Sequence, residues 1–297
     1  MSTHATSEKR RSKKASEGDI SSKSSKSAGR TRRAVYTAAT ADKHHLYERA
    51  VQSPEAEIQF IDRTFRAICG RLPDVLREDF CGTAFMACTW VRSRPTNRSI
   101  GVDLDKPTLE WAITNNLSWL APEERERVEL ICADVNAVRG IYADVIAAFN
   151  FSYYIFKTRP QLLKYFKAAR RGLRQGGLFY LDCYGGYEAQ DVLKEPRKCA
   201  GYTYVWDQAH FNPVTSETLC HIHFEFPDGT KMNKAFTYDW RLWTIAEIRE
   251  LLEQAGFSRS TVYWEGTDED GEGNGIFRPS TKGEVCAGWV SYIIAQR

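Results

Sequence analysis

The stretch that decides the fold of this chain reads VLREDFCGTA and spans residues 75–84. Val75 and Leu76 open a short strand, and a helical pattern runs from Ala84 to Val91. The small residues between them, with Gly82 at their centre, let the backbone approach a ligand closely. One such turn is weak evidence, so the order of the elements around it matters more.

The rest of the chain alternates between strand and helix patterns. Strands are predicted at residues 75–76, 99–102, 128–132, 144–149, 178–181, 259–264 and 285–295. Helices are predicted at residues 42–69 in two pieces that break at Ser53-Pro54, and at 84–91, 107–119, 161–173 and 244–256, with a capping box of Thr244 and Glu247. This alternation indicates a parallel sheet covered on both faces, which binds ligands beyond the carboxyl ends of its strands.

Residues 187–240 break the pattern. Residues 221–226 alternate polar and apolar, a turn follows at 227–229, and a second strand is predicted at 231–238. This segment is predicted to be an antiparallel β insertion. By contrast, residues 265–275 are acidic and rich in glycine, which predicts a flexible loop at the rim of the ligand-binding face.

Carboxylates stand at the ends of successive predicted strands. Glu78 follows the first strand, Asp103 ends the second, 21 residues after Gly82, and Asp134 ends the third. Asp103 is suited to accept hydrogen bonds from both ribose hydroxyls, and Asp134 from an adenine amino group. A pyrophosphate-binding turn needs the three glycines of G-x-G-x-x-G, and only Gly82 is present. The pattern therefore favours an adenosine cofactor without phosphates over a nicotinamide dinucleotide.

This order of motifs resembles the class I S-adenosylmethionine-dependent methyltransferases, over roughly residues 40–297. Their first motif reads as an acid, any residue and G-x-G-x-G; here Glu78 is the acid, Gly82 the central glycine, and Phe80 and Ala84 replace the outer glycines. The resemblance implies an α/β, Rossmann-like fold: a seven-stranded, mostly parallel sheet with helices on both faces, an antiparallel last strand, and a β-rich insertion between strands five and six.

The resemblance also implies S-adenosyl-L-methionine as cofactor. Glu78 occupies the position near its methionine end, and Tyr47 lies in a helix that folds over the cofactor in many relatives, unless it is a packing residue. The residues expected to bind the cofactor are Tyr47, Glu78, Phe80, Cys81, Gly82, Asp103, Leu104, Asp134, Val135 and Asn150.

Polar and aromatic side chains after strands four and five are the candidates for handling the acceptor. The residues expected to be catalytic are Asn150, Tyr153 and Tyr184. Two interpretations of the segment after strand four are equally supported. Either Asn150, Ser152 or Tyr153 positions an acceptor amine, or Asn150 caps the strand and the aromatic rings pack. Tyr184 is expected to line the acceptor pocket, while Asp182 either joins it or only caps a turn.

Arg241 has two possible roles. It either clamps a substrate carboxylate or pairs with Asp239 or Glu247, which is the commoner fate of such an arginine. His221 and His223 share one face of a strand but have no further ligands at metal-binding spacing, so no metal site is predicted.

The expected activity is in-line methyl transfer to a small molecule or a protein side chain. A sulfonium methyl is already activated, so the enzyme mainly has to align the acceptor and exclude water. A nitrogen acceptor needs no strong base, and no histidine stands in the core motifs, which favours nitrogen. The alternatives are a non-catalytic adenosylmethionine-binding module and a methyltransferase directed at RNA or DNA.

The chain begins with a basic segment that suggests that last alternative. Residues 1–33 hold ten Lys or Arg against three acidic residues, a local charge of +7, which leaves the rest of the chain at −4. This predicts a disordered tail over residues 1–35, followed by a methyltransferase domain over 36–297. Binding of nucleic acid through the tail is possible but not favoured, because the remainder is acidic.

The cellular setting is predicted from cysteines and hydropathy. The eight cysteines form no C-x-x-C pair and several lie in apolar runs, which is typical of reduced thiols in an intracellular protein. No apolar run is long enough to span a membrane. The expected location is cytoplasmic, or nuclear in a eukaryotic cell.

Overall fold

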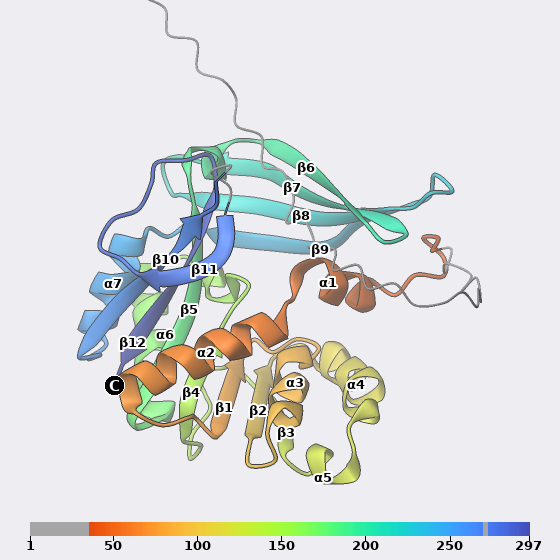
Figure 1. Cartoon of the computed structure of the whole chain (residues 1–297). Helices are drawn as coiled ribbons and strands as arrows, with labels where there is room; N and C mark the ends of the chain where they lie inside the picture. Colours follow the sequence, from red (N-terminus) through yellow and green to blue (C-terminus); the bar gives the residue numbers. More distant parts are fainter. Residues whose placement is uncertain (1–35, 270–272) are drawn as a thin grey trace, which may run out of the picture.

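The computed structural model of the chain describes residues 36–269 and 273–297. The basic tail predicted for residues 1–35 lies outside the described residues. Two sheets make up the β structure: one of eight strands in the order β11-β10-β12-β5-β4-β1-β2-β3, and one of four strands in the order β6-β7-β8-β9 (Figure 1).

The parallel part of the large sheet holds its first five strands. They are β1 (Val75–Asp79), β2 (Arg98–Asp103), β3 (Val128–Cys132), β4 (Ala143–Ala148) and β5 (Leu173–Gly185). Leu76 of β1 is paired with Ser99 of β2 on one side and Val145 of β4 on the other. Because all five run the same way, the acids predicted at their ends come to one edge of the sheet.

Three later strands extend the sheet beyond β5. They are β10 (Arg259–Thr267), β11 (Gly273–Pro279) and β12 (Trp289–Gln296). As predicted, the last strand is antiparallel: β12 lies between β5 and β10 and runs against both.

The strand count differs from the prediction by one. The sheet has eight strands instead of seven because β11 pairs antiparallel with β10 at the edge. Of the segment expected to be a flexible loop, residues 265–267 belong to β10 and residues 273–275 to β11, while residues 270–272 lie outside the described residues. Backbone pairing outweighs the glycine-rich, acidic composition there. The last strand also begins later than expected, at Trp289, and Val285 is exposed.

Helices cover both faces of the large sheet. α2 (Pro54–Cys69), α3 (Phe85–Ser93) and α4 (Lys106–Asn115) share one apolar core with it, and α6 (Arg159–Gly172) and α7 (Ile245–Gln254) share the other. The other described helical segments are α1 (Lys43–Val51), α5 (Pro122–Arg125), η1 (Leu117–Trp119), η2 (Ser152–Ile155) and η3 (Tyr187–Gln190). The predicted capping box of α7 is confirmed, because Thr244 and Glu247 exchange hydrogen bonds.

Strand β4 shows why the sheet is buried on both faces. Val145 and Ala147 belong to the core under α2–α4, whereas Ile146 and Ala148 belong to the core under α6 and α7. Apart from Asp144 near its start, β4 is apolar, as a strand of a parallel sheet between two helical layers is expected to be.

The predicted β insertion is a four-stranded antiparallel sheet. Its strands are β6 (Leu193–Cys199), β7 (Tyr202–Asn212), β8 (Glu217–Glu225) and β9 (Lys231–Arg241), twice the number that the alternation pattern predicted. The sheet lies across the molecule beyond α1 (Figure 1). Leu46 and Ala50 of α1 pack against Ile222 and Phe224 of β8, so the helix connects the insertion to the rest of the fold.

Candidate active site

The turn after β1 has a left-handed backbone conformation at three positions, two of which are not glycine. Phe80, Gly82 and Ala84 all have positive φ values, of 61°, 51° and 55°. These are the three positions at which the methyltransferase motif usually carries glycine, the residue that adopts this conformation without strain. The turn therefore has a glycine-type geometry although two of the three glycines are replaced.

Asp103 holds this turn in place. One oxygen of its carboxylate accepts a hydrogen bond from the Gly82 N–H at 2.7 Å, and the other accepts from the Asp105 N–H at 2.9 Å. A carboxylate has about four lone-pair sites, so capacity remains for further donors such as hydroxyl groups.

A pocket of about 240 Å³ opens beside the turn. Its walls come from α1 and the residue after it, from the β1–α3 turn, from the end of β2, from the β4–η2 turn and from β9. The lining residues are Lys43, His44, Tyr47, Gln52, Glu78, Asp79, Phe80, Cys81, Gly82, Thr83, Asp103, Asp105, Thr108, Phe149, Asn150, Ser152 and Phe236. The pocket thus brings together Tyr47, Asn150 and the predicted cofactor-binding residues of the first two motifs.

The remaining predicted cofactor-binding residues do not line this pocket. Leu104 is 71% exposed, Asp134 is exposed, and Val135 is buried. Asp134 accepts a hydrogen bond from the Asn136 N–H at 2.8 Å. Their assignment to the adenosine end stays a prediction.

The β4–η2 turn is strained and is held by Asp182. Asn150 and Phe151 have consecutive positive φ values, of 56° and 57°. The Asp182 carboxylate accepts hydrogen bonds from the N–H groups of Asn150 at 2.6 Å and Phe151 at 2.9 Å. Asp182 therefore caps a turn, which was the simpler of its two predicted roles, and that turn presents Asn150 to the pocket. Burial raises the pKa of Asp182 to about 7.

Tyr153 and Tyr184, which were expected to handle the acceptor, lie elsewhere. Tyr153 is fully buried and its hydroxyl donates to the Asp182 carbonyl at 2.6 Å. The Tyr184 ring packs on Phe151, with 4.7 Å between ring centroids, and neither tyrosine lines the pocket. Both rings pack against other aromatic rings, and the buried Tyr184 hydroxyl has no hydrogen-bond partner among the described residues. No signal in the sequence distinguishes a packed tyrosine from one beside a ligand.

Carboxyl groups in unusual surroundings lie around the pocket. Glu78 is buried and accepts a hydrogen bond from the Ala87 N–H at 3.1 Å. Burial and the nearby Glu57 raise its pKa well above the ordinary value. Burial likewise raises the pKa of Glu57, on the first turn of α2, to about 8, and Asp182 and Glu55 add to this.

Two buried polar atoms that line the pocket have no hydrogen-bond partner. They are the Thr83 hydroxyl oxygen and the side-chain carbonyl oxygen of Gln52. Buried polar groups are nearly always paired, so these two indicate that the pocket takes a polar ligand. Sequence reasoning missed Gln52 and Phe236, since only the fold brings the end of α1 and β9 to the β1–α3 turn. It also missed Thr83, although that residue directly follows Gly82 in the motif.

Arg241 does not line the pocket. Its guanidinium donates to Glu247 at 2.8 Å and lies 3.8 Å from the centre of the Trp243 ring. The predicted alternative, pairing with Glu247, is confirmed. Among residues 36–269 and 273–297, no group of three or more His, Cys, Asp or Glu side chains is arranged to hold a metal ion.

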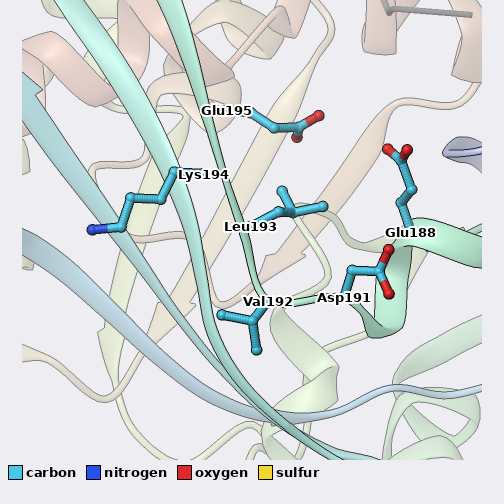
Figure 2. A pocket seen from close by; sticks show the side chains of 6 residues that line it. All are labelled: Glu188, Asp191, Val192, Leu193, Lys194 and Glu195. Carbon is cyan, nitrogen blue, oxygen red and sulfur yellow. The ribbon is translucent and has the colours of Figure 1, made fainter. Parts of the chain in front are cut away.

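A larger hollow of about 480 Å³ lies at the start of the insertion, between η3 and β6. Figure 2 shows the carboxylates of Glu188 and Asp191 close together there, while Lys194 points away from them. The hollow contains no residue of the β1–α3 turn and no unpartnered buried polar atom. The pocket beside Gly82 is therefore the candidate active site.

In the part of the chain that the structure describes, no helix is long and apolar enough to cross a membrane.

Solved structures with the same fold were found, although no protein-family model and no curated protein matches the chain. A methyltransferase dependent on S-adenosylmethionine from Clostridium acetobutylicum superimposes with a TM-score of 0.62 at 18% identity, covering 85% of this chain and 96% of that one. CalS10, an amino pentose methyltransferase from Micromonospora echinaspora, gives 0.60 at 16% identity, covering 86% and 95%. The sugar N-methyltransferase KedS8 from Streptoalloteichus gives 0.57 at 16% identity, covering 94% and 99%.

These likenesses extend over most of both chains and confirm the predicted fold. The chain has the fold of the class I S-adenosylmethionine-dependent methyltransferases.

Proposed function

We propose that this protein transfers a methyl group from S-adenosyl-L-methionine to a nitrogen atom of a small molecule or a protein side chain. The observation that carries the proposal is the β1–α3 turn, where three left-handed residues and the Asp103 carboxylate form a glycine-type loop under a pocket. The unpartnered Thr83 hydroxyl supports a polar ligand at this loop.

The residues present fit this cofactor. Asp103 would accept hydrogen bonds from the ribose hydroxyls, and Glu78 would face the ammonium group of the methionine end. Tyr47 and Phe236, with 5.0 Å between ring centroids, would cover the site and keep water out. The cofactor supplies an activated methyl group, and the chain's own residues align the acceptor with it.

Nitrogen is favoured as the acceptor for two reasons. Of the described side chains that line the pocket, His44 is the only imidazole, and burial lowers its pKa, which makes it a weak base for a hydroxyl acceptor. In addition, CalS10 acts on an amino pentose and KedS8 is a sugar N-methyltransferase, which supports an amine as the acceptor class.

Calorimetric titration with S-adenosylmethionine tests the proposal. The wild-type protein should bind it, and Asp103→Asn should bind about tenfold more weakly, because the amide keeps one acceptor oxygen but loses the charge. Glu129→Gln, an exposed position on the adjacent strand β3, is the matched control and should bind normally. Absence of binding to the wild type, or equal binding by Asp103→Asn, would contradict the proposal.

A further inference from the structure

One amide side chain joins α1, which forms a wall of the pocket, to the β1–α3 turn. Asn116 lies directly after α4, and its side-chain nitrogen donates to the Glu48 carboxylate of α1 at 2.7 Å and to the Thr83 carbonyl of the turn at 2.9 Å. Asn116 is fully buried and Glu48 is 5% exposed, so water does not compete for either bond. Two segments that are 68 and 33 residues away along the chain thus meet at one side chain.

The orientation of the Asn116 amide is fixed by these two partners. Both of them are acceptors, so the nitrogen has to face them, and an amide turned the other way would place its oxygen against two other oxygens. The amide oxygen is consequently buried without a hydrogen bond. An unpaired buried acceptor is costly, and an apolar side chain at this place would avoid the cost. We therefore attribute the presence of an amide here to the two bonds that its nitrogen makes.

The bond to Thr83 acts on the left-handed part of the turn. The Thr83 carbonyl directly precedes Ala84, whose φ is 55°, and Asp103 holds the turn on the other side of Thr83 through the Gly82 N–H. Thr83 lines the pocket, and its buried hydroxyl has no hydrogen-bond partner. Asn116 therefore helps to set the position at which the turn and this hydroxyl meet a ligand.

The bond to Glu48 acts on α1. Tyr47, the residue before Glu48, lines the pocket, as do other residues of this helix. Helix α4 holds α1 at a second point, because the Trp111 Nε1–H donates to the carboxylate of Asp42, the N-cap of α1, at 2.8 Å. Helix α1 also packs against the insertion (Figure 1). The position of Tyr47 at the pocket is thus set from α4 by two hydrogen bonds to carboxylates.

We propose, on the basis of the proposed function, that Asn116 is a positioning residue that couples cofactor binding at the β1–α3 turn to the placement of α1. It does not line the pocket and acts through Thr83 and Glu48. A cofactor in the pocket contacts both the turn and α1, and Asn116 holds the two in place before the cofactor arrives. Without it, the Thr83 carbonyl and the Glu48 carboxylate lose their common donor, and the cost of arranging both segments is paid on binding.

Asn116→Asp tests the coupling, because a carboxylate has no hydrogen to donate to Thr83 or Glu48. Calorimetry on the whole protein should show that this variant binds S-adenosylhomocysteine about tenfold more weakly than the wild type does. Asn115→Asp is the matched control. It makes the same change one residue earlier, where the side chain donates to the Trp111 carbonyl of its own helix, and its affinity should stay within about twofold of the wild type.

Two further measurements separate positioning from a general loss of stability. When Glu48→Gln is added to Asn116→Asp, an amide at position 48 can donate to the carboxylate at position 116. The double variant should therefore bind more tightly than Asn116→Asp but more weakly than the wild type, because the Thr83 carbonyl still lacks its donor. In amide hydrogen exchange, S-adenosylhomocysteine should slow exchange in α1 of the wild type and should slow it by a smaller factor in Asn116→Asp.

Equal affinities of Asn116→Asp and Asn115→Asp, or the same slowing of exchange in α1 of Asn116→Asp as in the wild type, would overturn this inference alone. So would a double variant that binds no more tightly than Asn116→Asp. If circular dichroism shows that Asn116→Asp is unfolded, Asn116→Ala replaces it, with Asn115→Ala as its control, and the comparisons of affinity and exchange decide. Failure of the wild type to bind S-adenosylhomocysteine would overturn the proposed function as well.

Discussion

At the scale of single residues, the β1–α3 turn is left-handed at Phe80 and Ala84 although neither residue is glycine. A non-glycine residue in the left-handed region costs about 1–2 kcal/mol. At Phe80 this cost is offset by packing, since its ring lies 5.4 Å from that of Tyr165 and 6.1 Å from that of Phe156. At Ala84 the methyl group is fully buried, which offsets only about 0.8 kcal/mol.

A pair of glycine substitutions tests this account. Ala84→Gly relieves the left-handed strain but loses a buried methyl group and adds chain entropy to the unfolded state, so its free energy of unfolding should stay within about 1 kcal/mol of the wild type. Ala87 is the third residue of α3 and is equally buried, but its backbone is helical. Ala87→Gly therefore relieves no strain, and its free energy of unfolding should be lower than that of the wild type by about 2 kcal/mol. Urea denaturation compares the two. Equal losses would show that Ala84 is not strained.

The buried ion pair of Arg77 and Asp79 lies at the end of β1, directly before the β1–α3 turn. The Arg77 guanidinium donates to Asp79 at 2.7 Å, both side chains are almost wholly buried, and the Tyr165 hydroxyl donates to the same carboxylate. Arg77→Met should lower the free energy of unfolding by about 3–5 kcal/mol, because it leaves the Asp79 carboxylate without its cation. Arg71→Met removes a half-exposed guanidinium from Asp144, which keeps Arg174, and should cost about 1 kcal/mol or less. Chemical denaturation of both variants measures the difference, and similar losses would contradict it.

At the scale of secondary-structure elements, the β4–η2 turn depends on a side chain from another strand. Asp182 lies on β5, and its carboxylate pairs with the backbone of both left-handed residues of the turn. Without it, two N–H groups would lose their acceptor and the turn would no longer hold Asn150 beside the pocket.

Substitution of Asp182 should therefore lower the free energy of unfolding by an amount that depends on how many acceptor oxygens are removed. Asp182→Asn keeps one acceptor oxygen and should cost about 1–2 kcal/mol, while Asp182→Ala removes both and should cost about 3 kcal/mol or more. The affinity for S-adenosylmethionine should fall in the same order, since Asn150 moves with the turn. Thermal unfolding and calorimetry on the two variants provide the measurements, and an alanine variant as stable as the asparagine variant would argue against this role.

At the scale of the whole molecule, two acids with raised pKa values predict how stability changes with pH. Glu57 has its pKa raised from 4.5 to about 8, so the folded chain holds this proton more tightly than the unfolded chain does. Its contribution to the free energy of unfolding is therefore greatest below about pH 4.5 and is lost as the pH rises to about 8. Asp182, with its pKa raised from 3.8 to about 7, acts in the same direction.

Glu57→Gln isolates this contribution. The variant should gain stability relative to the wild type as the pH rises from about 5 to about 8, and the gain should level off above that, where the carboxyl group is ionised in both states. Urea denaturation of both proteins across this range gives the difference. The exposed Glu55→Gln variant should show a nearly constant difference, and the same flat profile for Glu57→Gln would contradict the raised pKa.

Much of the central fold was predictable because it follows from local patterns. Apolar runs such as that of β4 identify strands buried on both faces, and the capping box at Thr244 identifies the start of α7. The extra edge strand β11 and the strand β6 of the insertion were not predicted, because backbone pairing with a neighbour stabilises a strand whose own residues are polar or rich in glycine. Strand β7 was not predicted either, although its aromatic and β-branched residues are typical of a strand.

The sequence by itself determined the class of fold and the acids at the strand ends, because parallel strands bring their carboxyl ends to one edge regardless of what lies between them. Only the tertiary structure decided which side chains meet in the pocket. It placed Gln52 and Phe236 there and packed Tyr153 and Tyr184 away from it, since those contacts join elements far apart in the chain. It also showed that Phe80 and Ala84 keep the geometry of the glycines they replace, because backbone conformation is set by the surrounding hydrogen bonds and packing as well as by residue type.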